Sequence, residues 1–182
     1  MQVLKTAIPG LLEIDPQVFG DHRGYFFESY NKQKFYKAGI VAEFVQDNQS
    51  LSGKNVLRGL HFQNPPHAQG KLVRVIKGAV LDVALDIRKG SPTYGQHHKT
   101  VLTEENKRMF WIPAGFAHGF VTLEDDTIFS YKCTDIYNKE SEGSVLWNDP
   151  ELGIDWETED PILSEKDLVA QPLHELDSKF NY

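Results

Sequence analysis

The sequence predicts a mainly β fold, either a β-sandwich or a closed barrel, with short helices at its periphery. Short runs of alternating apolar and polar side chains dominate the middle of the chain, and Gly, Pro, Asn and Asp separate them. Many short strands at close spacing, with few helical stretches between them, are typical of these folds. The predicted strands cover residues 72–77, 79–87, 98–102, 109–112, 120–123 and 127–134.

The strand predicted at 79–87 has two different faces, because successive side chains of a strand point to opposite sides. One face is apolar and consists of Leu81, Val83, Leu85 and Ile87. The other combines acids with smaller side chains and consists of Val80, Asp82, Ala84 and Asp86. A barrel wall with a polar interior has this pattern, and so does a strand whose acidic face meets solvent. Both interpretations stay open at this stage.

Helices are expected only at the edges of the fold. Residues 31–39 begin with Asn31 and end with Gly39, which favour the start and the end of a short helix. Ser164 and Asp167 have the spacing of a capping box that opens a second short helix. The acidic stretch 147–160 is expected to be irregular and to lie on the surface.

The chain is expected to form a single domain over residues 1–182, long enough to bury roughly two thirds of its unfolded surface. Its single cysteine, Cys133, excludes an internal disulfide and suits a reducing compartment. The first residues do not resemble a signal peptide, and charged residues interrupt every apolar run before the ~20 residues that span a bilayer. We expect a cytoplasmic protein without a membrane partner.

The net charge of −7 is unevenly distributed. Residues 1–91 carry 12 basic and 8 acidic side chains, whereas residues 92–182 carry 7 and 18. An acidic protein of this kind is not expected to bind nucleic acid, which attracts basic patches. A small anionic ligand remains compatible, because local charges set the field of a pocket.

One histidine-containing stretch has an informative spacing. Gly59, Pro65, His67, Lys71 and Gly78 resemble the first signature of the cupin superfamily, G-x5-H-x-H-x3/4-E-x6-G. Here a proline stands at the position of one histidine ligand, and a lysine stands at the position of the glutamate ligand. The resemblance implies a small double-stranded β-helix, the cupin jelly-roll barrel.

The second cupin signature, P-x-G-x2-H, resembles the segment that runs from Pro113 to His118. It departs from the full signature at Lys107, in place of the leading glycine, and at Thr122, in place of the trailing asparagine. A divalent metal needs three or four lone-pair donors, and only His67 and His118 remain in the two signatures. We therefore expect neither a metal nor any other cofactor.

The positive charge of Lys71 suggests a different use for the former metal position. An ammonium there can stabilise negative charge on a substrate oxygen, as a metal would. The alternative is that Lys71 extends from the end of its strand into water.

Eight segments in the same order are similar to one metal-free cupin family, the dTDP-4-dehydrorhamnose 3,5-epimerases, and the similarity extends from near residue 1 to about residue 170. The segments are GDHRGYFFES (20–29), FVQDNQS (44–50), NVLRGLHFQ (55–63), GKLVRVIKG (70–78), IPAGFAHGF (112–120), YKCTDIY (131–137), SEGSVLWND (141–149) and LSEKD (163–167).

The resemblance implies epimerisation of dTDP-4-dehydro-6-deoxy-D-glucose at C3 and C5, which gives dTDP-4-dehydro-L-rhamnose. That chemistry needs a base on one face of the sugar, an acid on the other, and a positive group at the C4 oxygen. It needs no nicotinamide, and the chain has no G-x-G-x-x-G motif. The alternatives are an epimerase acting only at C3 or only at C5, a sugar-sensing cupin domain, and a metal-dependent cupin enzyme.

The family also implies a set of catalytic residues. His61 is the implied base, oriented by Asp167, and Lys71 holds the enolate oxygen. Tyr131 is the implied acid, and Asp82 supports the arrangement of His61 or Lys71. From the sequence pattern alone, Asp167 reads as a helix-capping residue and Tyr131 as an ordinary wall residue.

Substrate contacts follow from the same resemblance. Arg23 and Arg58 are implied to bind the diphosphate, and Tyr137 is implied to stack on the thymine. The other implied contacts are Phe26, Glu28, Gln46, Asp47, Asn48, His118, Glu142 and Lys166. Family members exchange amino-terminal strands in a homodimer, so Arg23 and Glu28 could serve the neighbouring pocket. Five histidines are expected to be exposed and without a role, namely His22, His67, His97, His98 and His174.

Overall fold

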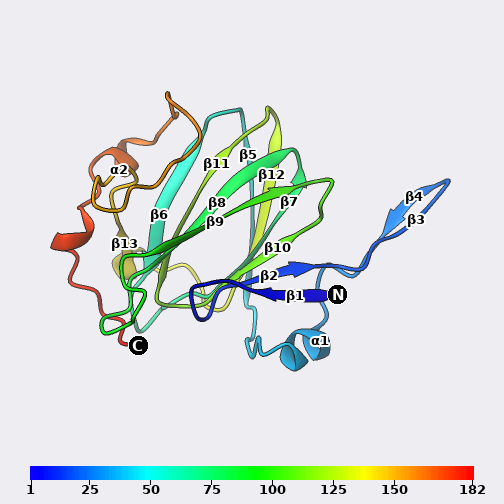
Figure 1. Ribbon diagram of the computed structural model, residues 1–182, viewed down its shortest axis with the longest axis horizontal. Coiled ribbons are helices and arrows are strands. Elements are labelled where there is room, and N and C mark those ends of the chain that lie inside the picture. Colours follow the sequence, from blue (N-terminus) through cyan, green and yellow to red (C-terminus); the bar gives the residue numbers. More distant parts are fainter.

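The protein is described by a computed structural model that covers all residues, 1–182. Two antiparallel sheets face each other, as Figure 1 shows. The six-stranded sheet contains, in spatial order, β1 (Gln2–Lys5), β2 (Leu12–Asp15), β10 (Met109–Ile112), β7 (Lys71–Lys77), β12 (Thr127–Cys133) and β5 (Gln46–Ser52). The five-stranded sheet contains β13 (Glu142–Ser144), β6 (Leu57–Gln63), β11 (Phe116–Thr122), β8 (Ala79–Asp86) and β9 (His97–Thr103).

The predicted mainly β jelly-roll fold is confirmed. A first apolar cluster fills the space between the two sheets, where side chains such as Val73 and Phe129 of one sheet meet Val80, Ala84 and Phe120 of the other. Such an interior stabilises the barrel because its apolar surface is removed from water. None of the helices has the length and apolar character that crossing a membrane requires.

The two faces of β8 are both buried. Asp82 on the inner face has no exposed surface, so the interpretation as a barrel wall is confirmed, with a polar group beside the apolar cluster of the interior. The outer, apolar face packs against the carboxy-terminal part of the chain, including Leu152, Trp156 and Leu173. The alternative of an acidic face that meets solvent is wrong, because Asp82 and Asp86 are both fully buried.

The stretch 147–160 is irregular, as expected, but it is not a simple surface segment. Leu152 and Trp156 are buried against the five-stranded sheet, and the indole N–H of Trp156 donates to the carbonyl of Trp147 at 2.8 Å. The expectation of a surface segment is thus wrong for Leu152 and Trp156, which pack against the outer face of the five-stranded sheet.

Helices are few and short. The α-helices are α1 (Lys32–Lys37) and α2 (Glu165–Leu168), and the 3-10 helices are η1 (Lys139–Ser141) and η2 (Leu173–Glu175). Both predicted α-helices are confirmed with their caps: the side chain of Asn31 accepts from the N–H of Lys34 at 3.2 Å, and Ser164 accepts from the N–H of Asp167 at 3.3 Å.

One small hairpin stands apart from the barrel. It consists of β3 (Phe19–Asp21) and β4 (Gly24–Phe26), which pair only with each other. Figure 1 shows this hairpin projecting from the end of the molecule that also holds α1. Its residues are exposed along their whole length.

Candidate active site

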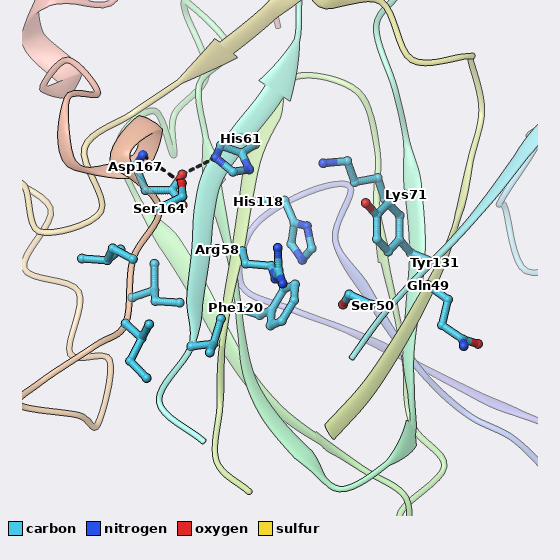
Figure 2. A pocket seen from close by; sticks show the side chains of 14 residues that line it. Gln49, Ser50, Arg58, His61, Lys71, His118, Phe120, Tyr131, Ser164 and Asp167 are labelled. Carbon is cyan, nitrogen blue, oxygen red and sulfur yellow. Dashed lines mark hydrogen bonds and ion pairs between the residues drawn. The ribbon is translucent and has the colours of Figure 1, made fainter. Parts of the chain in front are cut away.

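A cavity of about 430 Å³ opens inside the barrel, between β5, β6, β7, β11, β12 and the segment that leads into α2. Figure 2 shows its polar side chains converging from different strands. Its polar lining includes Arg58, His61, Lys71, His118, Tyr131 and Asp167. A smaller hollow of about 130 Å³ adjoins it, shares His61, Lys71 and Tyr131, and is called the mouth of the site.

A β-bulge aims two of these side chains into the cavity. Arg58 pairs with Phe120 of β11 and His61 pairs with His118, so β6 uses three steps where β11 uses two. In a regular strand, residues three apart point to opposite faces. The extra residue of the bulge places Arg58 and His61 on the same, inner face.

Two glycines make this bulge possible. Gly59 has a φ of +137°, and a Cβ atom there would lie 2.4 Å from the Cα atom of Gly119. A Cβ atom on Gly119 would in turn lie 2.9 Å from the carbonyl oxygen of Arg58. The backbones of β6 and β11 therefore touch at this point, and a larger residue would push the strand that carries His61 aside.

His61 and Asp167 form a hydrogen-bonded pair. The Nε2 atom of His61 lies 2.5 Å from Oδ1 of Asp167, and the hydroxyl of Ser164 donates to Oδ2 at 2.8 Å. Burial would raise the pKa of the Asp167 carboxyl, but the hydrogen bonds from His61 and Ser164 outweigh burial, so its pKa is lowered. Because Nε2 faces the carboxylate, the other ring nitrogen, Nδ1, is left for the cavity.

Asp167 thus makes both of the contacts that were expected of it, one with the helix cap and one with His61. Its backbone N–H belongs to the cap of α2, where it meets the Ser164 hydroxyl, while its carboxylate contacts His61 from 106 residues away in the chain. The residue is only 2% exposed. The cap and the side-chain pair are compatible because they use different atoms of the same residue.

Lys71 and Tyr131 lie on the side of the cavity opposite His61, and the Lys71 ammonium points into the space between His61 and Tyr131 (Figure 2). Burial lowers the pKa of Lys71, and the nearby Cys133, Asp82 and Glu142 oppose this shift. The ammonium makes no hydrogen bond or ion pair within the protein, so it can donate to a ligand.

Tyr131 belongs to β12, on the sheet that faces β6. Burial raises the pKa of its phenol, with a smaller contribution from Cys133 in the same direction. The phenol therefore keeps its proton at neutral pH, and it can act as a proton donor.

His118 and Asp82 form a second buried pair, deeper in the barrel. Nε2 of His118 lies 3.0 Å from each carboxylate oxygen of Asp82. Burial lowers the pKa of His118, and Asp82 opposes that shift. The expected support of His61 or Lys71 by Asp82 takes a different form, because its hydrogen bonds go to His118 instead.

The smaller hollow brings together four of the expected substrate contacts. Gln46, Asn48, Tyr137 and Glu142 line the smaller hollow. The Tyr137 hydroxyl donates to Glu142 at 3.3 Å, and Lys166 forms an ion pair with the same carboxylate. These side chains connect the loop after β12 with the helix that carries Asp167.

Four expected contacts lie away from the cavity of their own chain. Arg23 and Phe26 are on the exposed β3–β4 hairpin, where Arg23 pairs with Asp21 at 2.5 Å. Glu28 is paired with Lys34 near α1. The fourth, Asp47, is on β5.

Asp47 faces outward and pairs with Lys132 at 2.9 Å, whereas its neighbours Gln46 and Asn48 face the site. The side chain of Asp47 therefore lies outside this chain's own pocket, and its role as a substrate contact stays a prediction. Period-two alternation along β5 explains the difference, because neighbours in a strand point to opposite sides.

The remaining histidines do not line the cavity. His22 and His174 are exposed, as expected. The prediction of exposure is wrong for three partly buried residues, His67, His97 and His98. His98 in particular lies with Nε2 2.9 Å from Glu13, a contact that joins β9 to β2. No group of three or more His, Cys, Asp or Glu side chains is placed to hold a metal ion.

The apolar side of the cavity was not expected from the sequence. It consists of Val56, Leu57, Phe120, Ile162 and Leu163. Val56 and Ile162 meet in a parallel bridge, and the N–H of Leu57 donates to the carbonyl of Ile162 at 3.0 Å. This contact joins segments that are far apart in the chain, so no local sequence pattern predicts it.

Comparison with known proteins shows which enzyme family this chain resembles. A family model described as dTDP-4-dehydrorhamnose 3,5-epimerase matches residues 5–175. The enzyme of that name from Salmonella typhimurium is 59% identical over 172 residues, which cover 93% of this chain and 94% of the relative. The Shigella flexneri enzyme of the same name is 52% identical over 178 residues, which cover 97% of this chain and 98% of the relative.

Solved structures agree with this assignment. The dTDP-6-deoxy-D-glucose-3,5-epimerase of Legionella pneumophila, in complex with dTDP-4-keto-L-rhamnose, has a TM-score of 0.93 at 50% identity, covering 97% of this chain and 94% of that one. A 3'-monoepimerase from Streptomyces bikiniensis, in complex with dTDP-quinovose, has a TM-score of 0.88 at 33% identity, covering 93% and 86%. The chain therefore belongs to the dTDP-4-dehydrorhamnose 3,5-epimerase family.

Proposed function

We propose that this protein converts dTDP-4-dehydro-6-deoxy-D-glucose into dTDP-4-dehydro-L-rhamnose by inverting C3 and C5, a step of dTDP-L-rhamnose synthesis. The observation that carries this proposal is the arrangement of three groups around one cavity. A histidine backed by a buried carboxylate lies on one side, a protonated phenol lies on the other, and an unpaired ammonium points between them.

The first step is removal of a proton from a carbon beside the C4 ketone. Nδ1 of His61 accepts this proton, and the electron pair of the C–H bond moves into an enolate whose charge lies on the C4 oxygen. Asp167 stabilises the imidazolium that forms, and it holds the ring so that Nδ1 faces the sugar.

Lys71 stabilises the enolate. Its ammonium lacks a partner in the protein, so it can donate to the C4 oxygen without first breaking another contact. A preorganised donor of this kind stabilises charge that develops during the reaction more than it stabilises the ground state.

Tyr131 completes the inversion from the other face of the sugar. Its hydroxyl gives a proton to the carbon, the enolate returns to a ketone, and the configuration at that carbon is inverted. Solvent then removes the proton from His61 and reprotonates Tyr131, so the balance is restored. Repetition at the second carbon gives the product of the 3,5-epimerase, with no change in redox state.

The nucleotide end of the substrate is proposed to lie toward the mouth. Arg58 reaches the cavity from the bulge of β6 and is placed to bind the diphosphate, since its planar guanidinium suits phosphate oxygens. Tyr137 provides an exposed ring on which the thymine can stack. Gln46 and Asn48 line the smaller hollow together with Tyr137.

A homodimer is part of this proposal. Strands β1 and β2 pair within this chain's own sheet, so we restrict the exchanged element to the β3–β4 hairpin. Phe26 is 67% exposed, and Tyr25 and Phe19 are more than half exposed beside it. Exposed aromatic clusters of this kind mark interaction surfaces. A second copy of the chain would receive the hairpin, and Arg23, Phe26 and Glu28 would then border its pocket.

The place of action is proposed to be the cytoplasm. Cys133 is a free, buried thiol, which suits a reducing compartment.

The test is proton exchange in D2O, followed by NMR of the nucleotide sugar. With purified protein, we expect deuterium to enter both C3 and C5 and the L-rhamno product to form. Exchange at a single carbon would assign the protein to a monoepimerase instead. No exchange at either carbon would contradict the proposed reaction.

A further inference from the structure

The loop after β12, residues 134–138, carries Tyr137 to the mouth of the site with little support from its own backbone. Asp135, Ile136 and Tyr137 make no hydrogen bond to another backbone group. A loop with so few internal bonds would open easily if nothing else held it. The position of the Tyr137 ring therefore depends on side chains from other segments.

Gln63, in β6, makes the largest number of these contacts. Its Nε2 atom donates to the carbonyl of Ile136 at 3.1 Å, and its Oε1 atom accepts from the N–H of Asn138 at 2.8 Å. Nε2 also donates to the carbonyl of His67 at 2.6 Å. Gln63 is only 4% exposed, and its two amide hydrogens and its oxygen are all engaged.

Two further glutamines complete the support. Gln69 donates from Nε2 to the carbonyl of Asp135 at 2.7 Å, and Gln46 accepts at Oε1 from the N–H of Tyr137 at 2.9 Å. Four consecutive residues of the loop are thus each bound by a glutamine side chain. Gln63 is the only one of the three that holds two of them.

We propose that Gln63 is a positioning residue for the nucleotide end of the substrate. It fixes the loop so that the ring of Tyr137 is held where the thymine stacks, and the stacking energy is then available for binding without first ordering the loop. This inference rests on the proposed function, because it assigns the nucleotide base to Tyr137.

Gln63 makes no side-chain hydrogen bond to the proposed catalytic residues. Its side-chain hydrogen bonds go to loop backbone and never to Lys71, Tyr131 or Asp167. His61, two residues away in β6, has its own partner in Asp167. Loss of the Gln63 amide should therefore weaken binding of the nucleotide and leave the proton transfers intact.

The test is Gln63→Met, which keeps the length of the side chain and removes its three hydrogen bonds. We expect the Kd of dTDP and the KM of the nucleotide sugar to rise about tenfold or more, with kcat and its pH dependence unchanged. The amides of Tyr137 and Asn138 should also exchange faster with D2O. The matched control is Gln96→Met, because Gln96 is exposed and makes no side-chain hydrogen bond; it should behave like the wild type.

An unchanged Kd and KM in a folded Gln63→Met protein would overturn the inference, and so would a lower kcat with unchanged Kd. If that variant does not fold, Gln69→Met removes only the bond to Asp135, and it should still raise the Kd of dTDP. An unchanged Kd in Gln69→Met would then overturn the inference.

If the wild type binds dTDP and epimerises the sugar, and Gln63→Met binds dTDP with the same affinity, the inference about Gln63 is refuted and the proposed function stands. A wild-type protein that does neither would refute the proposed function, and the inference with it.

Discussion

Substitution of Asp167 by asparagine measures how much the carboxylate contributes to proton abstraction by His61, the proposed base. The amide has almost the same shape, so its oxygen can still accept from the Ser164 hydroxyl, which now donates at 2.8 Å. What changes is the contact at 2.5 Å with Nε2 of His61. An amide cannot stabilise an imidazolium as a carboxylate does. If its NH2 group donates to Nε2, the ring proton moves to Nδ1, and the base is blocked.

The expected loss can be bounded from these two effects. A hydrogen bond to a charged group contributes about 1.5–3 kcal/mol, which corresponds to about 10- to 100-fold in rate. A carboxylate-to-amide change that also imposes the wrong tautomer costs about 10⁴-fold in a Ser-His-Asp triad. Because Asp167 is almost completely buried, water cannot replace it. We expect kcat to fall by between about 100-fold and about 10⁴-fold.

The assay is steady-state turnover of the nucleotide sugar together with solvent deuterium exchange. KM should stay within about threefold, because Asp167 is behind His61 and is not proposed to touch the substrate. A folded Asp167→Asn protein that retains more than about a third of the wild-type kcat would refute the proposed role of the pair.

The same variant should change how stability depends on pH. The folded-state pKa of Asp167 is lowered, since its hydrogen bonds outweigh the effect of burial. A carboxyl with a lowered pKa stabilises the fold at pH values above its unfolded pKa of about 3.9 and loses that contribution as the pH falls through the folded value. The difference in unfolding free energy between wild type and Asp167→Asn, measured in urea, should therefore shrink toward acid pH. A difference independent of pH would contradict this reasoning.

Three other experiments test separate parts of the site. Tyr131→Phe should still admit deuterium at the carbons that His61 deprotonates, but inversion should fall by about 100-fold or more, as NMR of the sugar would show; unchanged inversion would exclude Tyr131 as the acid. Gly119→Ala should lower both the melting temperature and kcat, because the new Cβ atom would lie 2.9 Å from a β6 carbonyl; wild-type values for both would contradict the contact between the strands. Arg23→Ala and His61→Asn, each inactive alone, should regain activity when dimers are mixed, because one pocket of the hybrid is complete; no recovery would argue that Arg23 does not serve the partner.

Much of the barrel could be predicted from local patterns, because its strands obey period-two alternation. The strand predicted at 109–112 has the observed bounds, and those at 72–77, 79–87, 98–102 and 127–134 differ from the structure by one residue or so at their ends. Strand β11 begins at Phe116, earlier than the predicted residue 120. Both of its faces are buried, so its sequence does not alternate.

The strand that carries the proposed base, His61, was harder to predict. In β6 the bulge shifts the pattern between Arg58 and His61, so no single period fits the strand. The short strands β1 to β4 carry too few residues for any period to be detected.

The site was predicted from family resemblance and was only partly within reach of the residues alone. Asp167 joins His61 through tertiary contact, which no local spacing reveals. Asp47 shows the opposite case: strand parity alone predicts that its side chain points away from the cavity once Gln46 and Asn48 are placed inside. Gln63 was not predicted at all, because its side chain binds the backbone of a loop that lies 73 residues further along the chain.

The most direct test of the account is the exchange measurement in D2O made on wild type and His61→Asn side by side. The account predicts that wild type incorporates deuterium at both C3 and C5 of the 4-keto sugar nucleotide, and that folded His61→Asn incorporates it at neither carbon above the uncatalysed rate. Exchange by His61→Asn at the wild-type rate would contradict the claim that this histidine, paired with Asp167, is the base.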